Sequence, residues 1–288
     1  MKAFKATLSV LWGVRAMREL IRANFQRMFK SRLFWGCVLF MYIVSAGELL
    51  SSKIEQLTGA GSAVASVLDS LLYDGALRLC VVMAVFVSVF IGTDYSDGTI
   101  RNKITLGHHR SNIYLANLIV CASAAVIMQA IHLFSLIIPG SCLFHDMTAA
   151  TNEVIMLILL DMLAINAFSA IYVAICMTSR SKSTSAIVSL LFVFSVSLLS
   201  LIIFQELLQP EYVTDSVSLE LVRNSYYVDG LKRSLFVFLN DVLPSSQIMQ
   251  LESQQVIGHT DRFIIYDLAI MAVMTLGGII VFQGEDLK

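Results

Sequence analysis

Charged residues are scarce in this chain. Asp, Glu, Lys and Arg make up only 14% of its 288 residues, against roughly 25% in an ordinary soluble domain. There are only 3 prolines, and the 5 cysteines form neither a CxxC motif nor a Cys/His cluster. These absences exclude a soluble globule, a collagen-like chain and a disulfide or zinc framework. Because 20 basic and 21 acidic residues nearly cancel, the net charge does not indicate a nucleic-acid partner.

Catalytic and nucleotide-binding motifs are also missing. The sequence has no GxxxxGK[ST] loop to hold nucleotide phosphates, no HExxH metalloprotease motif and no GxSxG nucleophile elbow. His108 and His109 are adjacent, so on a helix they point about 100° apart and chelate a metal poorly. We therefore expect a protein that is not itself an enzyme and has no catalytic residue, metal site or cofactor of its own.

Long apolar runs dominate the sequence instead. Hydrophobic types make up 57% of it, and a transmembrane helix needs about 20 mostly apolar residues to cross roughly 30 Å of hydrocarbon. Six segments meet this requirement, near residues 33–50, 76–92, 112–138, 154–178, 185–207 and 262–282. The sequence therefore predicts an all-α membrane protein with six transmembrane helices in one membrane domain, residues 33–288.

Basic residues are unequally distributed between the two ends of these spans. One side has Lys2, Lys5, Arg15, Arg18, Arg22, Arg27, Lys30, Arg32, Arg101, Lys103, Arg110, Arg180, Lys182 and Lys288. On the other side, the connection around Thr148 has no Lys or Arg. The positive-inside rule therefore predicts a multi-pass protein with both termini in the cytoplasm.

The segment before the first span, residues 1–32, has an amphipathic pattern. A basic face lies opposite an apolar face formed by Met17, Leu20, Ile21, Phe25 and Met28. This pattern predicts an interfacial helix with its apolar face in the lipid and its basic face near anionic headgroups. The helix serves either as a simple topogenic anchor or as an anchor that also contacts a cytoplasmic partner.

The longest loop, residues 209–261, lies on the predicted outer side. Between Gly230 and Pro244 apolar residues recur at helical spacing, namely Leu231, Leu235, Phe238, Leu239 and Val242. Leu219 and Val222 suggest an earlier helix. We therefore expect short amphipathic helices on the outer membrane surface, or dipping into it, just before the last span.

The connection between the second and third spans is compact and bounded by glycines. Asp97 or Ser96 is placed to cap a short helix that begins near Gly98, and Gly107 to close it in a left-handed conformation. Ile100 and Ile104 share one face of this helix, with Arg101 and Lys103 beside them. The helix either docks through this apolar ridge into a groove on another protein or merely connects the two spans.

This connection resembles the segment after the second span in permease subunits of bacterial ABC-2 type ABC transporters. The likeness rests on Asp94 to Arg110, with the core Gly98-Thr99-Ile100-Arg101-Asn102 and the trailing Gly107, Arg110 and Ile113-Tyr114-Leu115. The six spans, the basic first helix and the outer-loop helices extend the likeness along the chain. The family often has Glu where this chain has Asp94.

The resemblance implies a protein of the bacterial plasma membrane whose short helix couples to a separate ATPase. That partner, a dimer of ABC ATPase subunits, would bind ATP and Mg, and a second permease subunit, identical or paralogous, would complete the membrane path. The implied coupling residues are Asp94, Gly98, Thr99, Ile100, Arg101, Asn102, Ile104 and Arg110.

Several polar residues lie inside the predicted spans: Gln129, His132, Asp161, Asn166 and Asp267. Ionisable groups in hydrocarbon are costly unless they face water or a partner. These residues either line a transport path in an outer vestibule, with His132 and Asp161 within reach of each other, or form interhelical hydrogen bonds that fix packing. A further possibility for Asp267 is that its side chain simply reaches the nearby headgroups.

We therefore expect a permease subunit of an ATP-driven exporter whose cargo is hydrophobic or amphipathic, such as an antimicrobial peptide. One alternative is a gradient-driven secondary transporter that uses His132, Asp161 and Asp267 as a proton relay. Another is a membrane subunit that senses an antimicrobial peptide, or confers immunity to it, without transporting it.

Overall fold

The computed structural model describes residues 2–58, 71–72, 74–143, 151–214, 220–253 and 259–284. Its longest apolar helices are α2 (Arg32–Thr58), α4 (Ala76–Ser96), α6 (Arg110–Leu143), α7 (Thr151–Ser179), α8 (Lys182–Leu207) and α11 (Thr260–Gly284). All six are long and apolar enough to cross a membrane. They confirm the six predicted spans, and all six extend beyond the predicted limits, most of all α2, which continues to Thr58. The protein is an all-α membrane protein.

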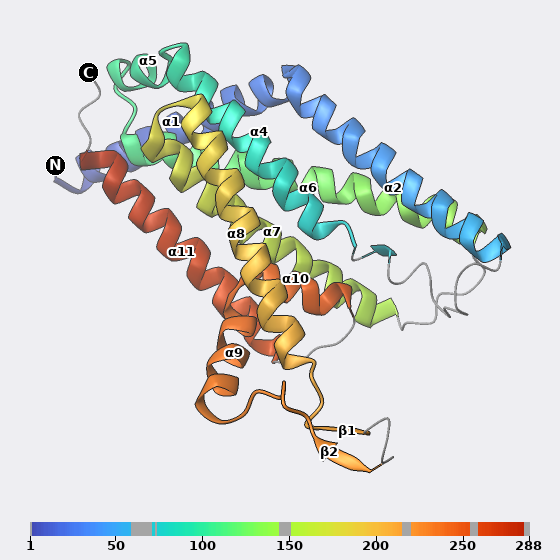
Figure 1. Cartoon of the computed structure of the whole chain (residues 1–288). Helices are drawn as coiled ribbons and strands as arrows, with labels where there is room; N and C mark the ends of the chain where they lie inside the picture. The colour runs from blue at the N-terminus through green and yellow to red at the C-terminus, as the bar shows by residue number, and fades with distance from the viewer. Residues whose placement is uncertain are drawn as a thin grey trace.

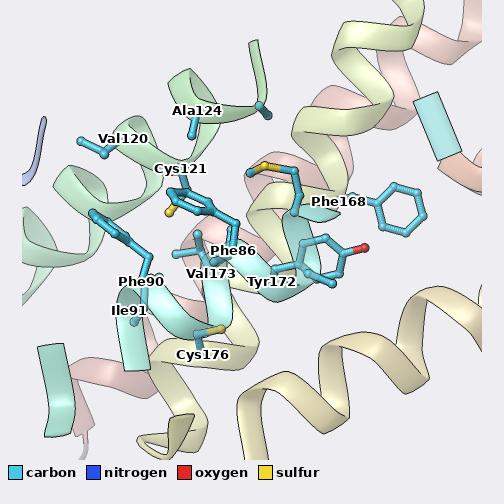
Figure 2. Packing of buried hydrophobic residues seen from close by; sticks show 14 of the residues in the cluster. Phe86, Phe90, Ile91, Val120, Cys121, Ala124, Phe168, Tyr172, Val173 and Cys176 are labelled. Carbon is cyan, nitrogen blue, oxygen red and sulfur yellow. The ribbon is translucent and has the colours of Figure 1, made fainter. Parts of the chain in front are cut away.

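The core of the bundle lies between α4, α6 and α7. The Phe86 and Phe90 rings of α4 stack with centroids 5.4 Å apart, and Phe168 and Tyr172 of α7 stack at 5.9 Å. Figure 2 shows these rings together with neighbouring side chains, among them Ile91, Val120, Cys121, Ala124, Val173 and Cys176. By contrast, α2, α8 and α11 expose many large apolar side chains, as expected for helices whose outer faces meet lipid.

A two-residue connection fixes α7 and α8 as neighbours. Arg180 adopts a left-handed conformation, with φ 54°, and the Ser181 side chain accepts a hydrogen bond from the Thr184 backbone N–H, at 3.4 Å. The turn reverses the chain while capping α8. Both helices pack against α4, so the turn lies beside the end of α4 from which α5 (Thr99–Thr105) follows.

The two ends of the bundle carry different structures (Figure 1). At one end lie α1 (Lys2–Lys30), α5 and the last turn of α11. At the other end lie α9 (Gly230–Val242) and an antiparallel pair of strands, β1 (Tyr212–Thr214) and β2 (Leu221–Arg223), in which Val213 faces Val222. The following helix α10 (Pro244–Glu252) packs back against α7 and α8.

The environment of α1 differs from the expectation. Leu20 and Met28 are buried, and Met17, Ile21 and Phe25 pack against the main core of the protein. The prediction that this apolar face lies in lipid is therefore wrong: the face packs on the protein, chiefly on α6. Amphipathicity identifies a face that avoids water but does not distinguish lipid from protein.

The outer loop also departs from the prediction in part. The helix expected between Gly230 and Pro244 is present as α9. The prediction of an earlier helix at Leu219 and Val222 is wrong for Val222, which lies in β2. Leu219 falls outside the described residues. The β-prone residues of the two short segments favour pairing across the loop. The helix α10, which follows α9 and was not predicted, is mostly buried.

Candidate coupling site

Two glycines set the limits of the short helix α5. Gly98 precedes it with φ 66° and Gly107 follows it with φ 87°, a left-handed conformation that glycine adopts without steric cost. The predicted role of Gly107 is confirmed. The predicted side-chain cap is wrong, since Gly98 is the N-cap and no side chain caps the helix; Ser96 Oγ instead donates to the Gly92 carbonyl, at 3.0 Å.

The two faces of α5 have different environments. Ile100 is only 1% exposed and belongs to the main core, and Ile104 packs against that core. The prediction that these isoleucines form an outward ridge is therefore wrong, because the chain buries them itself. The outward face instead presents Arg101, Asn102 and Leu106, the last of these 78% exposed.

Asp94, at the end of α4, lies at the centre of a buried group of charges. Its side chain is 1% exposed and forms ion pairs with Arg27 of α1 and Lys103 of α5, the latter at 3.1 Å from Nζ to Oδ2. The Arg27 guanidinium lies over the Phe90 ring, 3.8 Å from its centroid, where a cation–π interaction adds to the pairing. A buried carboxylate is tolerated when it is paired in this way.

Two asparagines extend these ion pairs to α6. Lys103 Nζ donates to Asn24 Oδ1 at 3.0 Å, and Asn24 Nδ2 donates to Asn117 Oδ1 at 2.7 Å. Both asparagines are buried. The Asp94 network, defined here as Asn24, Arg27, Asp94, Lys103 and Asn117, therefore joins α1, α4, α5 and α6.

Burial affects the two cations of this network. It lowers the pKa of Arg27 to about 10, and burial together with the nearby Arg27 charge lowers the pKa of Lys103 to about 8. Both groups remain charged at neutral pH. The Asp94 carboxylate favours the charged form of each cation, so the network holds two cations and one anion.

Four of these five residues were not predicted as site residues. Asn24 and Arg27 lie among the apolar residues of α1, and Asn117 stands alone in the apolar sequence of α6. A polar side chain on an otherwise apolar face is the signal that marks them, since such a group needs a buried partner. Their partners could not be identified, because α1 and α6 are far apart in the sequence.

The side chain of Arg110, another implied coupling residue, forms hydrogen bonds with the end of α11. Its Nη1 donates to the carbonyls of Phe282, at 2.9 Å, and Gln283, at 3.2 Å. These carbonyls end α11, where a cation compensates the helix dipole. Arg110 therefore fixes the start of α6 against the end of α11.

A hollow of about 360 Å³ opens beside α5. It lies between the α4–α5 turn and the α7–α8 turn, and its lining includes Gly98, Arg101 and Arg180. Tyr95 Oη donates to the Met177 carbonyl at 2.7 Å, which joins the last turn of α4 to the last turn of α7. Arg101 of α5 and Arg180 of the α7–α8 turn thus line the same hollow.

His132 of α6 has its partner on α2 rather than among the other polar residues inside the spans. His132 Nδ1 lies 2.6 Å from Ser45 Oγ of α2, and its ring leaves no room for a Cβ atom on Gly75. Within the described residues no hydrogen bond or ion pair joins His132 to Asp161. The predicted contact between them is therefore wrong: His132 fixes packing between α2 and α6.

The remaining intramembrane polar groups differ in their partners. Asn166 Nδ2 donates to the Met162 carbonyl of its own helix at 2.7 Å. Asp161 and Asp267 are both 0% exposed, and within the described part of the chain their carboxylate oxygens, like the Gln129 amide, have no hydrogen-bond partner. Asp267 is too deeply buried to reach the headgroups. In the same part of the chain no group of three His, Cys, Asp or Glu residues is placed to hold a metal ion.

No model of a known protein family matches the chain, and no curated protein matches it at a significant level. The functional interpretation therefore rests on the geometry of α5 and its surroundings, and on the resemblance carried by residues 94–110.

Proposed function

We propose that this protein is the permease subunit of an ATP-driven exporter and that α5 is the element on which a separate ATPase acts. The observation that carries the proposal is the two-sided environment of α5. Its inner face is held by the buried Ile100 and by Lys103 in the Asp94 network, and its outer face exposes Arg101 and Leu106. A short helix held on one side and exposed on the other suits the transmission of movement.

The Asp94 network favours transmission to several helices at once. A displacement of α5 acts on α4 and α1 through the ion pairs of Asp94, and on α6 through Asn24 and Asn117. Because buried ion pairs are costly to break, α5 moves together with these helices. Rigid-body rotation of the group would alternate the access of a path formed by two permease subunits.

The ATPase is expected to be a P-loop protein that binds ATP and Mg, since this sequence has no P-loop of its own. The resemblance favours a hydrophobic or amphipathic cargo such as an antimicrobial peptide, a bacterial plasma membrane, and cytoplasmic termini.

The test is purification of the tagged chain from native membranes in mild detergent, with identification of bound proteins. We expect a P-loop ATPase, and we expect Leu106→Glu to reduce its recovery about tenfold, because a charge in a desolvated contact is strongly unfavourable. Leu231→Glu is the matched control, since Leu231 is 88% exposed on α9 at the opposite end. Recovery of no P-loop protein with the unmodified chain would contradict the proposal.

One observation favours a second candidate, a gradient-driven transporter. Asp161 and Asp267 are buried carboxyl groups without hydrogen-bond partners among the described residues, which is a common setting for proton-binding groups. In that case Asp161→Asn abolishes transport and an uncoupler stops it, whereas under our proposal ATP depletion stops it. A sensing or immunity subunit would leave vesicle contents unchanged in either experiment.

A further inference from the structure

An apolar groove of about 780 Å³ runs along the outside of the bundle between α2 and α4. Leu33, Gly36, Cys37 and Phe40 of α2 line it, opposite Val81, Val82 and Val85 of α4, and Phe194 of α8 completes it. Its volume lies within the roughly 300–1,000 Å³ of typical ligand sites. The groove is open toward the surrounding lipid, since its neighbours Leu39 and Ile43 are exposed.

The lining includes two arginines with different surroundings. Arg78 forms ion pairs with Glu48 and with Asp74, so its charge is compensated. Arg32, the first residue of α2, is exposed, and no carboxylate of the described chain pairs with it. Because α2 begins at Arg32, this arginine lies at the headgroup level of the leaflet on the α1 and α5 side.

We propose that the groove binds an anionic phospholipid, with its phosphate on Arg32 and an acyl chain along Gly36 and Cys37. An acyl chain gains little by leaving bulk lipid for an apolar groove, because lipid tails are as apolar as the lining. Selectivity therefore comes from the headgroup. A basic residue attracts an anionic lipid by an amount that corresponds to about a fivefold difference in affinity.

The first experiment measures protection of the Cys37 thiol. The purified, delipidated protein in detergent is titrated with phosphatidylglycerol or phosphatidylcholine and then alkylated with N-ethylmaleimide, with the extent of reaction read at each cysteine by peptide mass mapping. We expect phosphatidylglycerol to protect Cys37 at about fivefold lower concentration. Cys142, which is exposed and outside the groove, is the internal control and reacts equally with either lipid.

Substitution of Arg32 tests the role of the headgroup. Arg32→Gln is expected to remove the difference between the two lipids at Cys37. Arg18→Gln is the control, because Arg18 is an exposed base on α1 outside the groove. It is expected to leave the difference unchanged.

A second experiment fills the groove. A Cβ atom on Gly36 or on Gly47, both on α2, would meet no atom within 4 Å, so Gly36→Leu and Gly47→Leu are both compatible with the fold, but only the first occupies the groove. Native mass spectrometry with added phosphatidylglycerol should show about fivefold fewer lipid adducts for Gly36→Leu than for Gly47→Leu.

Equal protection by the two lipids, no response to Arg32→Gln, or equal adduct numbers in the two leucine variants would each overturn the proposal. A second copy of the chain as the occupant would also overturn it. In that case Cys37 is protected before any lipid is added, and its protection increases with protein concentration.

Discussion

The buried carboxylates at the α5 end and those in the interior of the spans have different surroundings. At the α5 end, Asp94 is paired with Arg27 and Lys103. In the interior of the spans, Asp161 and Asp267 are equally buried, with no hydrogen-bond partner in the described residues. A paired carboxylate connects the helices that supply its partners, whereas one without an ion pair makes no such connection. The first arrangement suits a mechanical connection, and the second suits a packing role.

Removal of the charge of Asp94 is the strongest test of this difference. Asp94→Asn removes the carboxylate that pairs with both Arg27 and Lys103, so we expect a loss of about 3–5 kcal/mol in the free energy of unfolding. Thermal unfolding of the purified protein in detergent measures it. Asp229→Asn is the control, because it breaks the exposed ion pair with Arg223 and should cost at most about 1 kcal/mol. Equal losses would show that the network is not energetically special.

A second test concerns how the stability of the protein depends on pH through Glu252, at the end of α10. Burial, together with the nearby charge of Asp74, raises the pKa of Glu252 to about 7, from an ordinary value of 4.5. Since the folded state favours the protonated form, stability is fully present below pH 4.5 and is lost as the pH rises through 7. Glu252→Gln should therefore stabilise the protein at pH 8, by at most about 3 kcal/mol, and have little effect near pH 4.5.

Melting temperatures at the two pH values measure this effect. Glu55→Gln is the control for the substitution itself, because Glu55 is exposed on α2. An equal gain for Glu252→Gln at both pH values would contradict the interpretation, since it would not arise from titration.

The packing of the α5 end can be tested without changing charge. A Cβ atom on Gly92 would lie 2.7 Å from the Lys182 Cα atom, so Gly92→Ala must separate α4 from the start of α8 and should destabilise the protein by about 1–3 kcal/mol. Gly277→Ala on α11 meets no atom within 4 Å and should stabilise it by about 0.5–1 kcal/mol. Thermal unfolding of both variants measures the contrast; a gain in stability for Gly92→Ala would show that this crossing is loosely packed.

The smallest effect is expected in the interior. Asp161→Asn replaces the carboxyl group by an amide of similar shape, so we expect a change in stability below about 1 kcal/mol, and ATP-dependent transport should continue. Transport assays in vesicles, together with thermal unfolding, measure both quantities. Loss of transport with an unchanged melting temperature would favour the gradient-driven alternative.

Much of the fold could be predicted from the sequence. The six spans follow from apolar length, and the helix after Gly98 and the turn at Gly107 follow from local conformational preferences. The candidate site was predicted only in part. Ile100 and Ile104 were predicted to contact a partner protein, whereas they pack within the chain. Helical periodicity shows which residues share a face, but not which surface covers that face.

The partners of the charged residues were the least predictable feature. Asn24 and Asn117 are 93 residues apart in the sequence and form one hydrogen bond, and Arg110 binds carbonyls at the end of the last helix. Such pairings depend on which helices become neighbours. No local pattern in the sequence contains that information.

By itself, the amino-acid sequence determined that this protein lies in a membrane, where its spans lie and where its short connecting helix begins and ends, because hydrocarbon thickness and backbone sterics act on consecutive residues. Only the tertiary structure decided that Asp94 is held by α1 and α5, that Ile100 is buried and that Asp161 stands apart from His132. These outcomes depend on distances between helices, which are established only when side chains far apart in the sequence pack against one another.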